Sequence, residues 1–127
     1  MAKILVVEDD EMISRMVRLR LEMASHQVDT AANGREGVDK ALAGTYDLVL
    51  MDMHMPVMDG HEATLTLRKQ NYSGTIAALT ASVMTRDSNH AIEAGCNHFL
   101  AKPIGPDFEE RIQRILDAPG NTQFHDR

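Results

Sequence analysis

The stretch KILVVEDD, residues 3–10, decides the fold, because an unbroken apolar run leads directly into three acidic residues. An apolar run without alternation is typical of a strand whose two faces are both covered by helices in a parallel sheet. Short apolar runs recur at residues 28–31, 48–51, 75–79 and 98–101. Segments of 16 to 23 residues with a mostly helical pattern separate them, so the chain is predicted to be a strand-helix repeat.

The segments between the runs carry apolar residues at helical spacing, so a helix is expected in each, with the third expected over residues 59–69. The residues of this kind in the first two helices are Ile13, Met16, Val17, Leu21, Val38, Ala41 and Leu42. Gly95 suits a left-handed end to the fourth helix, and Pro106 suits the first turn of the fifth. This alternation predicts an α/β, flavodoxin-like fold: a five-stranded parallel sheet, order 2-1-3-4-5, with five helices on both faces.

Composition narrows the classes of function. The chain has 127 residues, which fits one domain, and 13 Lys and Arg against 19 Asp and Glu give a net charge of −6. This charge disfavours nucleic acid as a direct partner. The single cysteine, Cys96, excludes an internal disulfide, and no apolar run approaches the ~18 residues that span a bilayer. We therefore expect a cytoplasmic protein with no membrane or nucleic-acid partner.

Polar residues stand where the predicted strands end. In a sheet of this order, ligands bind outside the carboxyl ends of the strands, at the switch point between the first and third strands. The residues that follow the first, third, fourth and fifth runs are, in that order, Glu8 with Asp9 and Asp10, Asp52, Thr80, and Lys102. Carboxylates, one hydroxyl and one ammonium group are thus expected to converge at one edge of the sheet.

The acidic residues at this edge need a counter-charge. Asp10 is explained as a helix cap, since carboxylates suit helix N-termini. Glu8, Asp9 and Asp52 would repel one another, because two unit charges about 4 Å apart cost about 4 kcal/mol at an effective dielectric of about 20. Mg²⁺, which takes one or two carboxylates together with water and phosphate oxygens, would offset this repulsion. We expect a Mg²⁺ site here, with helix capping or a raised carboxyl pKa as the alternatives.

Four ordered motifs carry a resemblance to a known family. They are Val7-Glu8-Asp9, then Asp52 with Met55-Pro56 and Asp59-Gly60, then Leu79-Thr80-Ala81, and finally Lys102-Pro103. In this order they resemble the receiver domain of bacterial two-component response regulators. The receiver is assigned to residues 1–117. Residues 118–127, which show no periodicity, are expected to form a flexible tail or the start of a linker.

The resemblance implies a phosphorylation switch centred on Asp52. Asp52 would accept a phosphoryl group from a phosphohistidine of a histidine kinase or a histidine phosphotransfer protein. Glu8, Asp9 and Asp52 would bind Mg²⁺ together with the backbone carbonyl of His54, and Lys102 would pair with the acceptor or its phosphoryl group. Transfer to a carboxylate needs little more than this nucleophile, metal and cation. The chain would then catalyse only its own phosphorylation and dephosphorylation.

The resemblance also implies how the switch would be read. Thr80 would hydrogen-bond the phosphoryl oxygen and Phe99 would follow its movement. His54 and Ser82 would flank the phosphoryl group and tune its hydrolysis, in a direction that the sequence leaves open. A downstream protein would bind the face made by the fourth helix, fifth strand and fifth helix, expected to include Ala91, Phe99, Phe108 and Ile112. Whether phosphorylation also drives homodimerisation stays open.

Other functions were weighed against this one. A flavin mononucleotide carrier of the same fold would need a Ser, Thr or Gly-rich phosphate loop where this chain has Glu8 and Asp9. A small Mg²⁺-dependent aspartate phosphatase would have a second Asp where this chain has His54. A third alternative concerns context: no output domain follows residue 117 in the sequence, so the chain is either a stand-alone receiver or a module from a hybrid histidine kinase.

Overall fold

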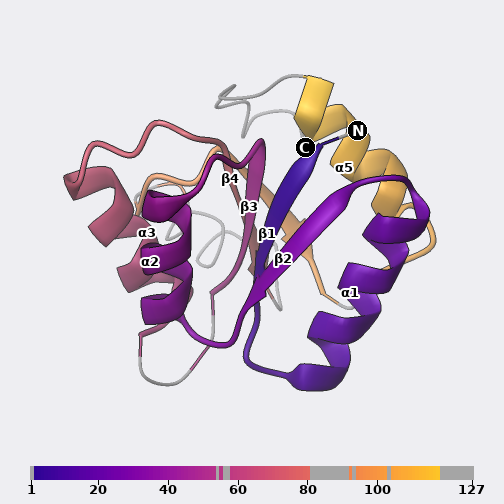
Figure 1. Ribbon diagram of the computed structural model, residues 1–127, viewed down its shortest axis with the longest axis horizontal. Coiled ribbons are helices and arrows are strands. Elements are labelled where there is room, and N and C mark those ends of the chain that lie inside the picture. Colours follow the sequence, from indigo (N-terminus) through magenta and orange to yellow (C-terminus); the bar gives the residue numbers. More distant parts are fainter. Residues whose placement is uncertain are drawn as a thin grey trace.

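Five strands form one parallel sheet, in the predicted order β2-β1-β3-β4-β5 (Figure 1). The structure is a computed structural model that describes residues 2–53, 55, 58–80, 92, 94–102 and 104–117. The strands are β1 (Lys3–Val7), β2 (Gln27–Ala31), β3 (Leu48–Asp52), β4 (Ile76–Thr80) and β5 (His98–Ala101). The helices within these residues are α1 (Glu11–Met23), α2 (Gly34–Ala43), α3 (Gly60–Lys69) and α5 (Phe108–Asp117).

The ends of two strands differ from the prediction in a way that matters for function. The bounds predicted for β1 and β5 are confirmed, and β2 begins one residue earlier, at Gln27. Asp52 and Thr80, expected to follow their strands, are instead the last residues of β3 and β4. In the parallel ladders Asp52 is paired with Leu79, and Thr80 with Ala101. Both polar side chains are therefore held by the sheet and not by loops.

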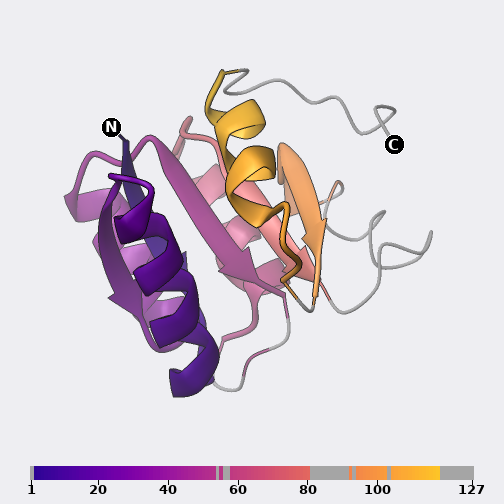
Figure 2. The same cartoon turned by 90° about the vertical axis from the view of Figure 1, so that its right-hand side faces the viewer.

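Helices cover both faces of the sheet, with α2 and α3 on one face and α1 and α5 on the other (Figures 1 and 2). Alternate residues of each strand pack into the two core layers, one on each face of the sheet, because successive side chains of a strand point to opposite faces. Leu5 and Val7 pack in the layer under α2 and α3. Ile4 and Val6 pack in the layer under α1 and α5. This arrangement leaves the carboxyl edge of the sheet as the place where strand-end residues meet.

The fourth helix and the tail fall largely outside the described residues. Ile92 and Ala94 have helical backbone, but residues 81–91 and 118–127 are not among those described. Gly95 has φ of +114°, which confirms the left-handed conformation predicted there. Pro106 was expected in the first turn of α5 and lies instead in the turn before it, where Phe108 N–H donates to the Gly105 carbonyl at 3.3 Å.

The core faces of α1 and α2 contain only some of the apolar residues that predicted these helices. Val17 and Leu21 are fully buried, as expected. Met16 is 41% exposed and Leu42 is 44% exposed, so neither belongs to the core. Helical spacing identified both residues, but α1 is apolar on two faces and spacing alone does not say which face meets the sheet.

Polar residues fix the helix starts. Asp10 is the N-cap of α1, where its carboxylate accepts from the backbone N–H groups of Met12 and Ile13. Asn33 and Asp59 cap α2 and α3 in the same manner. The interpretation of Asp10 as a cap is confirmed. Among the described helices, none is both long enough and apolar enough to cross a membrane.

A half-buried cation, Arg68, ties together the amino end of the sheet. Its guanidinium donates to four oxygens at 2.7–3.0 Å, namely the carbonyls of Tyr72, Gly74 and Gly95 and Oδ1 of Asn97. Asn97 Oδ1 also accepts from Ile76 N–H at 2.9 Å. We call this set the Arg68 network. It joins α3 to the segments that lead into β4 and β5.

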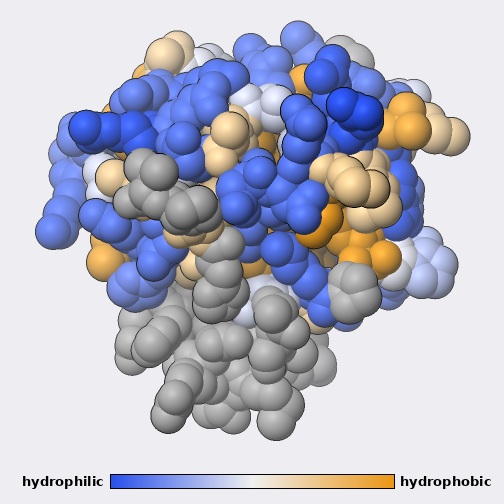
Figure 3. Space-filling model, turned by 90° about the horizontal axis from the view of Figure 1, so that it is seen from below, coloured by the Kyte–Doolittle hydropathy of each residue, from blue (hydrophilic) through white to orange (hydrophobic). Residues whose placement is uncertain are grey.

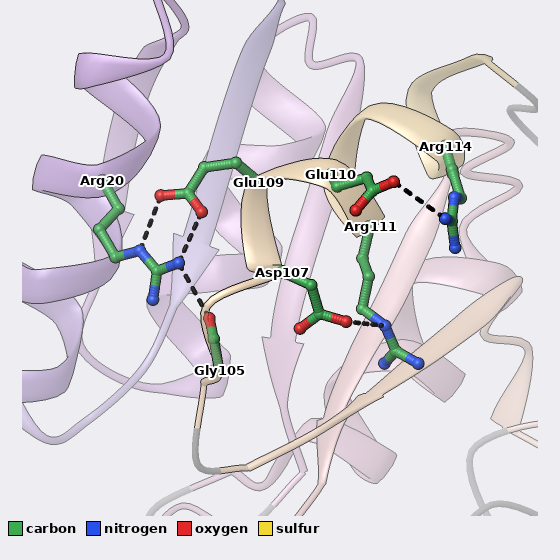
Figure 4. A network of polar contacts seen from close by, with 7 residues as sticks. All are labelled: Arg20, Gly105, Asp107, Glu109, Glu110, Arg111 and Arg114. Atoms are coloured by element: carbon green, nitrogen blue, oxygen red, sulfur yellow. Dashed lines mark hydrogen bonds and ion pairs between the residues drawn. The ribbon is translucent and has the colours of Figure 1, made fainter.

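A second arginine joins α1 to α5 (Figure 4). Arg20 donates to both carboxylate oxygens of Glu109, at 2.7 and 2.5 Å, and to the Gly105 carbonyl at 2.9 Å. Its guanidinium carbon also lies 5.3 Å from the centre of the Phe108 ring. A bidentate pair fixes the orientation of both side chains. The two helices on this face are thus joined beside the loop that follows Lys102.

Candidate functional site

Four predicted site residues meet at the carboxyl edge of the sheet, which is the lowest edge in Figure 1. Val7 of β1 is paired with Met51 of β3, so the residues that follow them, Glu8 and Asp52, lie side by side. Glu8, Asp9 and Asp52 each offer one carboxylate oxygen, and these oxygens lie within 4.8 Å of one another. Seen from this side, the described surface is largely hydrophilic (Figure 3).

Lys102 joins the two buried carboxylates. Its Nζ lies 3.1 Å from Asp52 Oδ1 and 3.4 Å from Glu8 Oε1. Asp52 is 1% exposed and Glu8 is 3% exposed. One ammonium group thus balances two carboxylates in a setting where screening by water is weak. With Asp9 at the exposed rim, the four side chains carry two more negative charges than positive ones when all are ionised.

The protonation of the pair reflects this imbalance. Burial raises the pKa of Glu8 to about 7, and the neighbouring Asp52 carboxylate adds to the rise, although the Asp10 N–H bond and Lys102 oppose it. Burial acts to lower the pKa of Lys102, but its ion pairs with Asp52 and Glu8 outweigh burial, so the pKa is raised. Lys102 is therefore a permanent cation, and Glu8 takes up a proton more readily than an exposed glutamate does.

The donor set fits a hard divalent cation. Oε1 of Glu8 is buried and, within the described residues, has its ion pair with Lys102 but no hydrogen-bond partner. Asp9 is exposed, so an ion can be reached from solvent on that side. Carboxylate oxygens with room for water are what Mg²⁺ prefers. The acidic cluster could therefore bind a metal ion.

Two glycines bring backbone unusually close to the site, and the sequence analysis did not single out this role. A Cβ on Gly60 would lie 2.2 Å from the Asp52 carbonyl oxygen, so no side chain fits there. A Cβ on Gly34 would lie 2.1 Å from the Met58 carbonyl, to which Gly34 N–H donates at 3.0 Å. Asp59-Gly60 was visible as a motif. Its packing against the backbone of Asp52, eight residues earlier in the chain, is not evident from the motif alone.

The predicted switch residues lie on the two strands beside Asp52. Thr80 is fully buried, and its carbonyl accepts from Lys102 N–H at 2.8 Å, so the β4 and β5 ends are joined. Phe99 is on β5, is partly buried, and packs against the core layer of α2 and α3. His54 and Ser82, whose roles were predicted, lie outside the described residues. Ala91 and Pro103 lie outside them as well.

One part of the predicted docking face is wrong. Phe108 is 3% exposed and Ile112 is fully buried, both packed against the sheet. Their helical spacing marks the core face of α5, so they do not belong to a protein-binding surface.

The strand order and the acidic edge define a flavodoxin-like α/β domain with a cluster of carboxylates at its switch point that could bind a cation. The family model for the response regulator receiver domain matches residues 4–115 of the chain. The chain therefore belongs to the receiver domain family of two-component response regulators.

Individual proteins support this membership. The response regulator ArlR of Staphylococcus saprophyticus is 37% identical over 115 residues, which is 91% of this chain and 51% of ArlR. The chain thus spans about half the length of the curated relatives it matches. Chemotaxis protein CheY4 of Vibrio cholerae is 35% identical, with a TM-score of 0.84 over 91% of this chain and 98% of that one.

A further solved structure bears on the metal. The receiver domain of sensor histidine kinase PA1611 from Pseudomonas aeruginosa is 34% identical, with a TM-score of 0.81 over 92% of this chain and 95% of that one. It carries a magnesium ion coordinated in its active site cleft.

Proposed function

We propose that this chain is a phosphorylation-dependent switch in which Asp52 accepts a phosphoryl group from a phosphohistidine of a histidine kinase or a histidine phosphotransfer protein. The observation that carries the proposal is the contact of Lys102 Nζ with two buried carboxylates, Glu8 and Asp52. A sheet edge with two buried acids and one cation is costly unless a ligand offsets the excess charge. A divalent cation offsets this excess charge, and its remaining coordination positions can take the oxygens of an anionic phosphoryl group.

The side chains divide the chemistry between them. Glu8, Asp9 and Asp52 would hold Mg²⁺, with the backbone carbonyl of His54 as a further ligand, and the ion would neutralise the phosphoryl oxygens. Asp52 is the nucleophile: a bond forms from its carboxylate oxygen to phosphorus as the phosphorus–nitrogen bond of the donor breaks. Lys102, whose Nζ lies 3.1 Å from Asp52 Oδ1, balances the carboxylate charge before transfer and would pair with a phosphoryl oxygen afterwards.

The chain would act on itself and not on other substrates. Water attacks the acyl phosphate on Asp52, which releases inorganic phosphate and restores the carboxylate. His54 and Ser82, two residues after Asp52 and Thr80 respectively, would set how quickly this happens. We therefore propose one phosphoryl group per chain and a reset by hydrolysis.

Phosphorylation would change a protein-binding surface through Thr80 and Phe99. A shift from about 1:99 to 99:1 between two states needs ~5.5 kcal/mol of differential interaction. Bonds from Thr80 and Lys102 to phosphoryl oxygens at ~1.5–3 kcal/mol each would supply ~3–6 kcal/mol. A downstream protein would read the face of the fourth helix, β5 and α5, without the buried residues Phe108 and Ile112.

The chain could serve this function in two contexts. ArlR is a response regulator about twice as long as the match, and PA1611 is a sensor histidine kinase with a receiver domain. We propose the response regulator context first, since the curated relatives that match are of that kind. The gene sequence on either side of the segment that encodes this chain would show which of the two contexts applies.

Intact-mass measurement after incubation with acetyl phosphate tests the proposal. Wild type is expected to gain the mass of one phosphoryl group only when Mg²⁺ is present, and Asp52→Asn is expected to gain none. Asp39→Asn, an exposed position on α2, is the matched control and should behave as wild type. A label on Asp52→Asn, or a label without metal, would contradict the proposal, and turnover of a free phosphate ester would favour a phosphatase.

A further inference from the structure

Helix α1 carries apolar side chains on the face that points away from the sheet. Its core face is formed by Val17 and Leu21, which are fully buried. The opposite face carries four large apolar residues that are exposed by 83%, 41%, 57% and 77%: Met12, Met16, Leu19 and Met23. We call these four residues the α1 stripe. Figure 3 shows apolar atoms gathered on the side of the molecule where α1 lies in Figure 1.

The α1 stripe is concentrated, not scattered. Within the described residues, the only other large hydrophobic residue with comparable exposure is Leu42, on α2. Single exposed apolar residues are common on protein surfaces, but a contiguous group marks a contact with another molecule. The spacing of the stripe also matches the alternating steps of four and three that pack two helices against each other.

This spacing reads the same in both directions along the helix. The steps from Met12 to Met23 are four, three and four residues. A second α1 that runs antiparallel would therefore place Met12 opposite Met23, and Met16 opposite Leu19, on both sides of a two-fold axis. We propose that two copies of this chain associate through their α1 stripes, antiparallel and two-fold symmetric, so that the same patch serves both partners.

The charges beside the stripe select the antiparallel direction. Arg15 and Glu22 lie on one flank of the stripe, and Arg20 lies on the other. In the antiparallel pair, the flank of one helix meets the same flank of its partner, so Arg15 lies beside Glu22 of the second copy, twice by symmetry. In a parallel pair, Arg15 would lie beside Arg20 of the second copy, and like charges would repel.

The flanking side chains are available for this arrangement. Arg15 is exposed and makes no ion pair with the part of the chain that the structure describes. Glu22 pairs with Arg18 at 3.1 Å on the surface, a contact that is easily exchanged. Arg20 is held by Glu109 and the Gly105 carbonyl (Figure 4), so it stays fixed at the edge of the stripe.

The size of the contact predicts its strength. About three turns of one helix from each copy bury less than the ~1,000 Å² expected of a stable interface. We therefore expect a weak dimer, with a dissociation constant on the order of 100 µM. None of the residues in the contact belongs to the acidic site, so this inference stands or falls separately from the proposed function.

Sedimentation equilibrium between about 10 µM and 1 mM tests the association. Wild type is expected to pass from monomer to dimer over this range. Leu19→Glu places a charge at the centre of the stripe and should weaken the dimer at least tenfold. Leu42→Glu, an exposed leucine on α2, is the control and should dimerise as wild type does. A chain that stays monomeric at 1 mM overturns the proposal, and the α1 stripe would then be a contact surface for a different protein. A dimer unaffected by Leu19→Glu overturns it as well.

Reversal of the flanking charges tests the direction. Arg15→Glu and Glu22→Arg should each weaken the dimer about fivefold, and the double variant should restore it, since each pair then has opposite charges again. A parallel dimer predicts the contrary for Arg15→Glu, because the new carboxylate would face Arg20. Stronger association of that variant would overturn the antiparallel arrangement.

Disulfide formation gives an independent measure of the same geometry. Cys96 is buried, so introduced thiols are the ones that react. Met12→Cys mixed with Met23→Cys should cross-link between copies, whereas Met12→Cys alone should not, because its two copies lie about 16 Å apart along the antiparallel axis. Cross-linking of Met12→Cys with itself would contradict the proposal.

Discussion

The two ends of the sheet each contain a partly buried cation, but the two cations are used differently. At the amino end, Arg68 donates to three carbonyl oxygens and to Asn97, all uncharged acceptors. At the carboxyl end, Lys102 faces two buried carboxylates, with Asp9 at the rim. The Arg68 network satisfies the groups it contains, whereas the Lys102 site holds an excess of negative charge.

This difference separates stability from function. A buried polar group that is fully hydrogen-bonded stabilises the arrangement of its neighbours. A cluster of like charges weakens the folded state and is relieved when a cation or a proton arrives. We therefore expect changes at the amino end to alter the free energy of unfolding alone, and changes at the carboxyl end to alter both stability and ligand binding.

The largest effect on stability is expected from Arg68→Met. This change removes the cation that donates to three carbonyls and leaves Asn97 Oδ1 with only its bond from Ile76 N–H, which should lower the free energy of unfolding by about 3–5 kcal/mol. Urea denaturation measures this loss. Lys69→Met, at the exposed neighbouring position, is the control and should change stability by less than about 0.5 kcal/mol. The fraction of folded chain that is phosphorylated on Asp52 should be the same in all three proteins.

The next effect is a dependence of stability on pH that originates at Glu8. The pKa of Glu8 rises from its ordinary value of 4.5 to about 7 in the folded chain, mainly through burial. Between these values the folded chain binds more protons than the unfolded chain, so stability falls as the pH rises from about 4.5 to 7. The loss is about 2–3 kcal/mol, since one pKa unit corresponds to about 1.4 kcal/mol.

Comparison of wild type with Glu8→Gln isolates this contribution. Burial lowers the pKa of His26, which gives a slope of the opposite sign, but His26 is present in both proteins. The difference in unfolding free energy between them, measured without divalent cations at pH 5.5 and pH 8, should therefore follow Glu8 alone. Equal pH dependence in the two proteins would show that Glu8 does not hold a proton in the folded state.

A smaller gain in stability is expected from Asp52→Asn. It removes one of two adjacent buried negative charges while Lys102 keeps its ion pair with Glu8, so the unfolding free energy should rise by about 1–2 kcal/mol without Mg²⁺. Addition of Mg²⁺ should stabilise wild type more than the variant. Thermal denaturation with and without the ion measures both. A variant less stable than wild type would mean that the Asp52 ion pair outweighs the repulsion.

The smallest effect is expected at the amino end, from Ser25→Gly. Ser25 follows α1 with φ of +75°, a conformation that glycine adopts without strain. The substitution should add about 0.5–1 kcal/mol to the unfolding free energy. Chemical denaturation measures the gain, and phosphorylation with acetyl phosphate should be unchanged. Reduced phosphorylation would show that the two ends of the sheet are coupled.

The sequence predicted the carboxyl end of the sheet better than the amino end. Glu8, Asp52 and Lys102 were found because each directly follows or ends an apolar run, and the strand order brings such residues to one edge. The Arg68 network was not found, because its acceptors are mostly backbone carbonyls and any residue can supply a carbonyl. Only the folded chain brings Tyr72, Gly74 and Gly95 around one guanidinium.

Helix α1 shows a second feature that could not be predicted from the sequence. Its sequence contains a core series, Ile13, Val17 and Leu21, interleaved with the four residues of the α1 stripe. Both series have helical spacing, so the sequence analysis placed Met16 and Val17 in one group of apolar residues. The docking of α1 on β1 and β2, which depends on the shape of the whole layer, decides between the two faces.

The order of the strands has a consequence for synthesis on the ribosome. β1, β2 and β3 are consecutive in the chain and adjacent in the sheet, so they can pair once the first 52 residues have emerged. Glu8 and Asp52 are then already neighbours, 50 residues before Lys102 emerges. The nascent protein passes through a stage in which the Lys102 ammonium group is not yet beside the two acids, and a metal ion or a proton can act as the counter-charge during that interval.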